Sequence, residues 1–197
     1  MIRSKFSEHT KAVDRVERLL RRTAEALEQS GISYAVVGGN AVAIWIGSVD
    51  PEAVRTTKDV DLLVDQKDVD RITEALEAIG LTRVDLRRIT LFLDPEKPDK
   101  KSGVHLVWSG VKVWPSNEVP TPTLEQVTHS EDGLRVIELG ALVQMKLVAD
   151  RYHDRAHIMD LYKAGLVTEE IRDALPEPLL DRLDMITSES PPDLLEE

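Results

Sequence analysis

The chain has 197 residues, a formal net charge of −11 and no cysteine. This length suits one domain with at most a small appendage, and a hydrophobic content of 42% is sufficient for a folded core. The absence of cysteine excludes disulfides, thiolate zinc sites and a catalytic thiol, and it fits a reducing compartment. The acidic balance argues against a protein that coats nucleic acid.

The negative charge is concentrated near the end of the chain. Residues 169–197 contain ten acidic and two basic residues, so residues 1–168 carry a net charge of only −3. A local basic groove for a polynucleotide is compatible with that near-neutral body. The sequence starts without an apolar leader core and contains no run of about 18 apolar residues. We therefore expect a cytoplasmic protein with no membrane partner.

Strand and helix patterns alternate in the first part of the chain. Apolar spacing and glycine positions predict a helix over 8–30, a strand over 33–37, a helix over 39–45, a strand over 59–64 and a helix over 68–79. Further strands are expected at 84–85, 88–93, 104–108, 111–114, 126–129 and 135–138, with 104–114 and 126–138 forming hairpins.

From residue 139 onward the pattern is helical, with helices expected at 139–151, 154–164, 169–174 and 178–187. The order of elements predicts an α/β fold with a mixed sheet and a C-terminal helical subdomain. We expect a core over residues 1–138, a helical subdomain over 139–187 and an acidic disordered tail over 188–197.

A glycine pair, Gly38 and Gly39, follows the first predicted strand and precedes a predicted helix. Glycines at such a junction let backbone N–H groups approach a phosphate, with the helix N-terminus behind them. Many glycine pairs are simple turns, and neither the Walker pattern nor the dinucleotide fingerprint is present. The next residue, Asn40, either caps the helix or contacts a phosphate or sugar, and capping is the favoured interpretation.

Two aspartates, Asp59 and Asp61, are separated by one residue on the second predicted strand. Residues i and i+2 of a strand share a face, and their Cα atoms are about 6.6 Å apart. Two carboxylates at this spacing can converge on a hard divalent cation. The alternative is a polar strand face, but Val60 and the apolar run 62–64 predict a buried strand. A carboxylate there is costly without a cation, which favours a metal site.

Three further polar residues, Arg55, Thr57 and Lys58, lead into the aspartate pair. A cation at this point could neutralise phosphate oxygens. For Arg55 and Thr57 a functional role and a surface role are equally well supported, and for Lys58 the surface role is favoured.

A charged run over residues 146–160 begins with Lys146 and includes His153 and His157 at i,i+4 spacing. Two histidines at this spacing can bind zinc, but no third ligand is evident, so a zinc site is disfavoured. A solvated helix face is the usual origin of such a run. Its density of charges beside apolar residues favours a helix edge that faces a site.

The stretch 37–41 (Val-Gly-Gly-Asn-Ala), together with 55–64 (Arg-Thr-Thr-Lys-Asp-Val-Asp-Leu-Leu-Val), resembles the DNA polymerase β-type nucleotidyltransferase superfamily. The later residues Lys146, Arg151, Asp154 and Asp160 are similar to its minimal bacterial branch, which includes AbiEii-type toxin nucleotidyltransferases. The resemblance spans roughly residues 10–165.

This resemblance implies a mixed-sheet core that transfers a nucleoside monophosphate from an NTP to a hydroxyl of an RNA 3′ end, a protein or a small molecule. Gly38 and Gly39 would contact phosphate, and Asp59 and Asp61 would hold Mg²⁺ or Mn²⁺. Lys146 would bind the triphosphate. Asp154 or Asp160 would orient the substrate or the helix edge. A toxin-type role in bacterial defence, with a cognate antitoxin, is the contextual hypothesis.

One departure from the superfamily concerns its third carboxylate, whose place is taken by His105 in the strand 104–108. Histidine can accept a proton or ligate a metal, but it is a poorer Mg²⁺ ligand than a carboxylate. His105 therefore serves as a base, or the protein binds nucleotide without turning it over as an inactive regulatory module. Asp94 is a weaker candidate for the missing acid. A purely structural protein that docks through its acidic tail is a third alternative, which the aspartate pair argues against.

Overall fold

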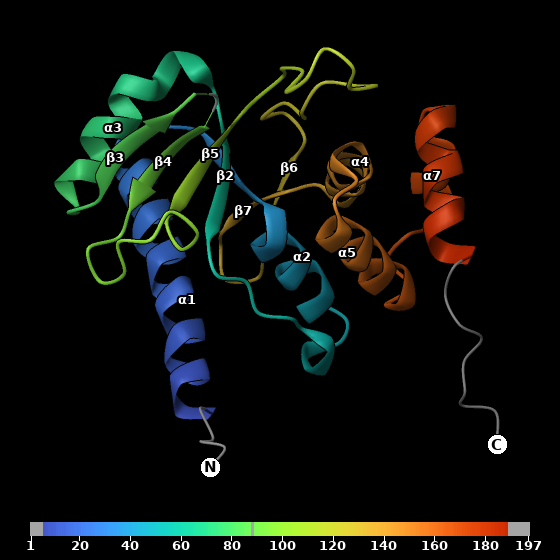
Figure 1. Ribbon diagram of the computed structural model, residues 1–197, viewed down its shortest axis with the longest axis horizontal. Coiled ribbons are helices and arrows are strands. Elements are labelled where there is room, and N and C mark those ends of the chain that lie inside the picture. The colour runs from blue at the N-terminus through green and yellow to red at the C-terminus, as the bar shows by residue number, and fades with distance from the viewer. Residues whose placement is uncertain (1–5, 88, 189–197) are drawn as a thin grey trace.

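The computed structural model describes residues 6–87 and 89–188, which form a mixed sheet flanked by helices (Figure 1). Within the described residues the sheet has seven strands in the order β3-β4-β5-β2-β1-β7-β6. The predicted α/β class with a mixed sheet is thereby confirmed. The helices are α1 (Phe6–Gln29), α2 (Gly38–Gly47), α3 (Val69–Ala78), α4 (Leu139–Ala149), α5 (Tyr152–Lys163), α6 (Glu169–Asp173) and α7 (Glu177–Ser188). The strands are β1 (Tyr34–Val37), β2 (Val60–Val64), β3 (Thr82–Leu86), β4 (Ile89–Leu93), β5 (Val104–Trp108), β6 (Val127–His129) and β7 (Arg135–Ile137).

The two central strands, β1 and β2, form the middle of the core. Every residue of β1 is buried, and in β2 only Asp61 is not. In Figure 1, α1 and α3 lie on one side of these strands, and α2, α4, α5 and α7 lie on the other. The long helix α1 packs its apolar face on one side of the central strands, and the second group of helices covers the other side. Both faces of these strands are therefore buried, which explains their nearly continuous apolar sequence.

The register of the central strands determines which polar residues meet. β1 is antiparallel to β2 and places Val37 opposite Asp61, whereas β2 is parallel to β5 and places Asp61 opposite His105. After β1 ends at Val37, the chain continues directly into Gly38 and Gly39, which we call the glycine turn. The glycine pair, the aspartate pair and the histidine are therefore brought to one end of three neighbouring strands.

The predicted strand over 111–114 is wrong. This segment lies in the loop after β5, where Thr121 holds it through hydrogen bonds with the backbone of Val111 and Trp108. The reason is that β5 pairs with β4 on one edge and with β2 on the other. Both edges are occupied, so no hairpin partner can be added. The second predicted hairpin, between β6 and β7, is confirmed.

The four predicted C-terminal helices are confirmed as α4 to α7, and α5 packs against α2 of the core. The boundary after residue 138 stays a prediction. Ser188 is the last residue of α7, and the rest of the predicted tail, 189–197, lies outside the described residues. Among the described helices, none combines the length and the apolar character needed to cross a membrane.

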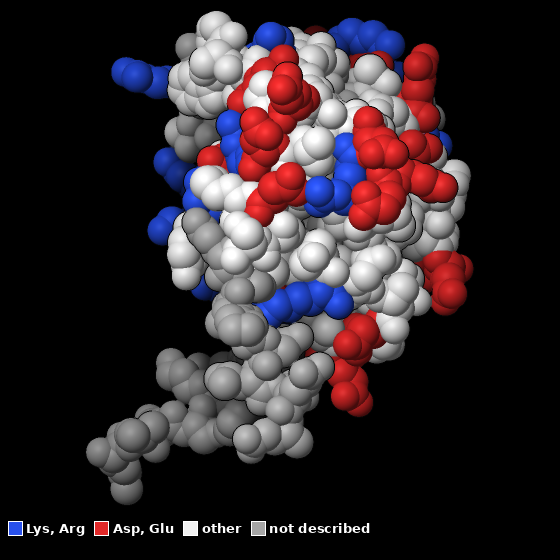
Figure 2. All heavy atoms as spheres, turned by 90° about the vertical axis from the view of Figure 1, so that its right-hand side faces the viewer, with Lys and Arg blue, Asp and Glu red and all other residues white. Residues whose placement is uncertain are grey.

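The face of the molecule that carries α7 is mixed in charge. Groups of Asp and Glu side chains cover much of it, with Lys and Arg between them (Figure 2). A polynucleotide backbone is bound by an uninterrupted row of cations. This face offers no such row.

Candidate metal and nucleotide site

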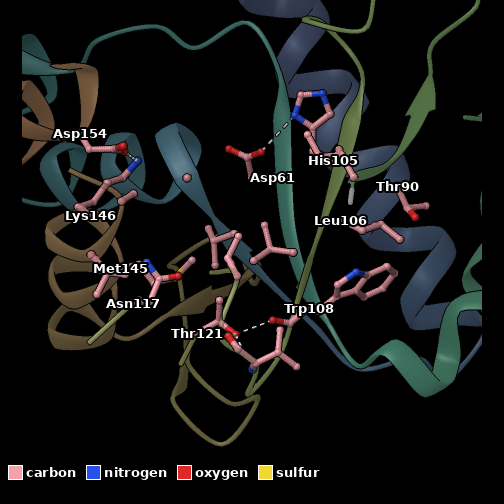
Figure 3. Close-up of a pocket in the computed structure, with 18 of the residues that line it drawn as sticks. Asp61, Thr90, His105, Leu106, Trp108, Asn117, Thr121, Met145, Lys146 and Asp154 are labelled. Atoms are coloured by element: carbon pink, nitrogen blue, oxygen red, sulfur yellow. Dashed lines mark hydrogen bonds and ion pairs between the residues drawn. The ribbon is translucent and has the colours of Figure 1, made fainter. Parts of the chain in front are cut away.

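Three potential metal ligands meet where β2 and β5 run side by side. Asp61 and His105 are register partners, and Asp59 lies just before β2. One ligand atom from each residue lies within 4.8 Å of the others, and among the described residues this is the one such group of three. Nδ1 of His105 lies 3.4 Å from Oδ1 of Asp61 and 3.7 Å from Oδ2 of Asp59. The predicted convergence of the two aspartates therefore includes His105 as well. Figure 3 shows the His105 ring facing Asp61.

The far side of the His105 ring is fixed by the backbone. Its Nε2 lies 2.6 Å from the carbonyl oxygen of Lys100. A carbonyl oxygen can only accept, so Nε2 carries the hydrogen, and the lone pair of the neutral ring is on Nδ1. The pKa of His105 is raised, chiefly by hydrogen bonding to Asp61, although burial opposes the shift.

Asp59 is held from two directions. Thr57 donates its hydroxyl to Oδ1 of Asp59 at 2.9 Å, and Nδ2 of Asn40 donates to the Asp59 carbonyl oxygen at 2.7 Å. The predicted helix cap is wrong, because α2 begins at Gly38 with Val37 as its N-cap. Asn40 is already inside the first turn and ties α2 to the aspartate segment instead.

The glycine turn approaches the carboxylates closely. Gly38 has a φ of +66°, and a Cβ built on it would overlap the carboxylate of Asp61. A Cβ on Gly39 would lie only 3.0 Å from the hydroxyl oxygen of Thr57. Both glycines line a cleft, and the N-terminus of the ten-residue helix α2 opens onto it. This arrangement presents backbone N–H groups and the positive end of a helix dipole to an anion beside the aspartates.

The opposite wall of the cleft carries cations held by a buried acid (Figure 3). Nζ of Lys146 on α4 lies 3.0 Å from Oδ1 of Asp154 on α5, and the Asp154 side chain is fully buried. Asp150, with a φ of 47°, ends α4 and turns the chain so that residues eight apart can meet. Burial raises the pKa of Asp154, but the hydrogen bond from Arg151 and the charge of Lys146 outweigh it, so the net shift is downward.

Arg151 is a site residue to which the sequence pattern gave no role. Its Nε lies 2.6 Å from Oδ2 of Asp154, and its guanidinium lines the cleft. The pKa of Arg151 is raised by the bond to Asp154, and the charges of Asp61 and Asp59 add to the shift. Its position within the charged run could have suggested this role. Because both cations contact Asp154, that carboxylate positions them rather than facing a ligand itself.

A histidine pair lies next to these cations. The ring centroids of His153 and His157 are 6.2 Å apart, and Nδ1 of His157 is buried without a hydrogen-bond partner in the described structure. Burial, and then the charge of Lys146, lower the pKa of His157 to about 4, so the ring is neutral at pH 7. Nε2 of His153 lies 3.7 Å from Oδ2 of Asp154, the acid that holds Lys146 and Arg151.

Two residues considered for the site are engaged elsewhere. Arg55 forms an ion pair with Asp160 at 2.9 Å, and neither residue lines the cleft. Asp94 is buried against Arg15, with Oδ2 of the acid 3.1 Å from Nη1 of the base. Asp94 as the missing third acid is therefore wrong, because its carboxylate is paired with Arg15 and is not part of the group formed by Asp59, Asp61 and His105.

The cleft encloses about 1260 Å³ between the sheet, the loop after β5 and helices α4 and α5. Beyond the metal ligands and the cations lies an apolar part, shown in Figure 3. We call it the apolar lobe; its main members are Leu106, Trp108, Val111, Val119 and Met145. Pockets for one small molecule usually enclose roughly 300–1,000 Å³. The cleft is therefore large enough for a nucleotide together with a second, partly apolar ligand.

Comparisons with known proteins define the fold. No family model and no curated protein matches the sequence. The solution structure of the antibiotic-resistance factor ANT(2'')-Ia matches with a TM-score of 0.55 and 14% identity, covering 90% of this chain and 91% of that one. The lincomycin-bound lincosamide antibiotic adenylyltransferase LnuA matches with a TM-score of 0.55 and 16% identity, covering 75% and 97%. A crystal structure of ANT(2'')-Ia with adenylyl-2''-tobramycin matches with a TM-score of 0.53 and 14% identity, covering 87% and 96%.

At these identities the likeness establishes the fold alone. The chain has the fold of nucleotidyltransferases, as the sequence resemblance predicted. The narrower AbiEii-type branch, the toxin role and the antitoxin stay predictions.

Proposed function

We propose that the protein is a metal-dependent nucleotidyltransferase that transfers a nucleoside monophosphate from an NTP to the hydroxyl of an acceptor. One observation carries the proposal. The glycine turn, the Asp59–Asp61 pair and the Lys146–Arg151 cations line the same cleft from opposite walls. An anion-binding helix end, metal-binding carboxylates and fixed cations are the groups that phosphoryl-type transfer requires.

The donor set fits a divalent cation. Two carboxylates and an imidazole nitrogen approach within 4.8 Å of one another, and the side chains of all three residues are only partly exposed. Gly38 also supports the assignment, because the space that a side chain would fill is needed beside Asp61. Asp59 and Asp61 would hold Mg²⁺ or Mn²⁺, with His105 adjacent. A bound ion would supply charge neutralisation at the triphosphate and polarise the acceptor hydroxyl.

The remaining steps belong to residues of the chain. Backbone N–H groups of Gly38 and Gly39 would donate to phosphate oxygens. Lys146 and Arg151, fixed by Asp154, would stabilise the charge that develops on the departing pyrophosphate. Thr57 would keep the Asp59 carboxylate in its orientation. The acceptor oxygen would form a bond to the α-phosphorus as the bond to pyrophosphate breaks.

The acceptor supported best is a small molecule with a hydroxyl group and an apolar body. The apolar lobe can bury such a molecule, and it lies in the same cleft as the metal ligands. Two structures with the same fold contain or concern small-molecule antibiotics, namely lincomycin and a tobramycin adduct. An RNA 3′ end and a protein hydroxyl, the acceptors of a toxin-type enzyme, are the other arms of the test.

A second candidate, a nucleotide-binding module without turnover, is favoured by one observation. His105 takes the place where the superfamily resemblance implies a third carboxylate. Such a module would bind an NTP with the same residues but would not transfer it.

Nucleotide binding is tested by calorimetry with Asp59→Ala and Asp61→Ala. We expect both variants to lose metal-dependent NTP binding. Asp65→Asn is a suitable control, because Asp65 lies directly after β2, pairs with the exposed Lys67 and is outside the cleft. Equal NTP affinity in wild type, Asp59→Ala and Asp61→Ala would contradict the site assignment.

Transfer is tested by incubating the protein with each α-labelled NTP, Mg²⁺ or Mn²⁺, and three kinds of acceptor. These are hydroxyl-bearing antibiotics, total RNA, and the protein itself with other proteins. We expect the label to be attached to a small-molecule acceptor and to be absent from RNA and from protein. Label on RNA or protein would support the toxin-type alternative. Tight NTP binding without label on any acceptor would leave the binding module as the function.

A further inference from the structure

The His105 ring has the two contacts that a metal-binding histidine usually makes. Such a ring offers one nitrogen to the ion and donates the N–H of the other to a carboxylate, a backbone carbonyl or water. Here Nε2–H is bound to the Lys100 carbonyl at 2.6 Å, and Nδ1 faces the two aspartates. The backbone contact fixes the tautomer that leaves a lone pair on Nδ1. The ring is therefore prepared as a ligand before any ion arrives.

The separations within the site also leave room for an ion between the donors. A charge-assisted bond from an imidazolium to a carboxylate is usually about 2.7–2.9 Å long. The distances from Nδ1 to Asp61 and Asp59 are 3.4 and 3.7 Å. Adjacent ligands of an octahedral ion with bonds of ~2.0–2.2 Å are roughly 3 Å apart. The separations from Nδ1 are several tenths of an ångström wider than this, so small movements bring the three donors around a shared position.

We infer that Nδ1 of His105 is the third protein ligand of this site, and that the resulting oxygen–nitrogen donor set selects Mn²⁺ over Mg²⁺. The inference deepens the proposed function, since the same site would hold the ion used in transfer. It does not depend on transfer, because the ion can be bound and observed without nucleotide.

The selectivity follows from the chemistry of the donors. Mg²⁺ prefers oxygen ligands and gives up water reluctantly, so a nitrogen ligand adds little to its binding. Imidazole suits several first-row transition ions, whereas carboxylate oxygens suit both Mg²⁺ and Mn²⁺. As a transition ion, Mn²⁺ gains more from the imidazole nitrogen than Mg²⁺ does. A carboxylate at position 105 would add a negative charge and complete an all-oxygen set. Histidine removes this negative charge and replaces an oxygen donor by a nitrogen donor. The number of donors is unchanged, so Mg²⁺ binding is weakened more than Mn²⁺ binding.

The ligand is tested by pulsed EPR of the full chain loaded with Mn²⁺ alone. We expect nitrogen coupling at the bound ion that changes from the ¹⁴N to the ¹⁵N pattern when histidine is ¹⁵N-labelled. His105→Ala should abolish this coupling. His129→Ala is the matched control, because His129 is exposed on β6 and outside the cleft, and it should leave the coupling unchanged. Bound Mn²⁺ without nitrogen coupling, or coupling that survives in His105→Ala, would overturn the assignment.

The selectivity is tested by titrating Mg²⁺ and Mn²⁺ into wild type and His105→Asp. We expect the ratio of the two affinities to shift toward Mg²⁺ at least about tenfold in the variant, the lower end of effects seen when even the groups that support metal ligands are altered. An unchanged ratio would refute selectivity through His105. If circular dichroism shows that His105→Asp is unfolded, His105→Asn, which also offers an oxygen, should shift the ratio in the same direction. The EPR experiment on ¹⁵N-histidine-labelled wild type tests whether His105 is a ligand without any substitution.

The outcomes separate this inference from the proposed function. Histidine coupling at bound Mn²⁺ without transfer of label to any acceptor would support the ligand and refute the enzyme. Transfer of label by a protein whose Mn²⁺ shows no nitrogen coupling would support the enzyme and refute the ligand.

Discussion

Gly38 is the position where a single methyl group should separate the geometry of the site from the stability of the fold. Its φ of +66° lies in the left-handed region, which costs an L-residue about 1–2 kcal/mol. A Cβ at this position would also overlap the Asp61 carboxylate, so either the aspartate or the glycine turn must move. We expect Gly38→Ala to lose about 1–2 kcal/mol of unfolding free energy from φ strain. We also expect its Mn²⁺ affinity to fall at least about tenfold, because a ligand is displaced.

Gly31→Ala provides the matched control. Gly31 has a φ of +61°, and a Cβ there would meet nothing within 4 Å. This variant should show the same φ strain with unchanged metal binding. Stability is measured by urea denaturation and affinity by Mn²⁺ titration, both without added nucleotide. If Gly38→Ala binds Mn²⁺ as tightly as Gly31→Ala does, the close approach of the glycine turn to Asp61 does not matter for the site.

Three further predictions concern buried ionisable groups and are measured by urea denaturation, with an Mn²⁺ titration added for the third. Asp154→Asn should cost about 3–5 kcal/mol, because it leaves Lys146 buried without its partner; a loss below about 1 kcal/mol would show that the pair is not coupled. The lowered pKa of His157 means that the ring is protonated more readily in the unfolded chain than in the fold. The free energy of unfolding should therefore decrease by about 2–3 kcal/mol as the pH falls from about 6.5 toward about 4. His157→Gln should flatten this part of the pH profile, and an unchanged profile would contradict the shifted pKa. Asp94→Asn should destabilise the fold by unpairing Arg15 but leave Mn²⁺ affinity unchanged, whereas weaker Mn²⁺ binding would return Asp94 to the site.

The sequence predicted the parts of the site that depend on local periodicity. Asp59 and Asp61 follow from the two-residue repeat of a strand, and Gly38 follows from its place between a strand and a helix. Position 105 stands out in the sequence only as a departure from the superfamily pattern. Nothing local could show that β5 lies parallel beside β2 with these residues in register. The same long-range pairing explains why residues 111–114 do not form a strand, since both edges of β5 are occupied by β4 and β2.

The wall of cations depends on a break in helical periodicity. Helical spacing pairs Lys146 with Asp150 and predicts that Asp154 lies about two turns further along. The left-handed conformation of Asp150 ends α4 and brings Asp154 back to Lys146. A non-glycine residue in that conformation is uncommon, so the spacing alone could not identify the contact, and Arg151 at the start of α5 was missed as a site residue.

The loop before β5 holds His105 in place through the backbone of Lys100. The turn before β5 is fixed by Asp99, whose backbone carbonyl accepts from Ser102 N–H at 2.9 Å and whose side chain accepts from Lys101 N–H at 3.0 Å. Gly103 lets this turn pass close to β4, because a Cβ there would collide with the carbonyl oxygen of Phe92. These contacts hold the Lys100 carbonyl against the imidazole. A histidine ligand uses a fixed tautomer of this kind to present its lone pair to an ion.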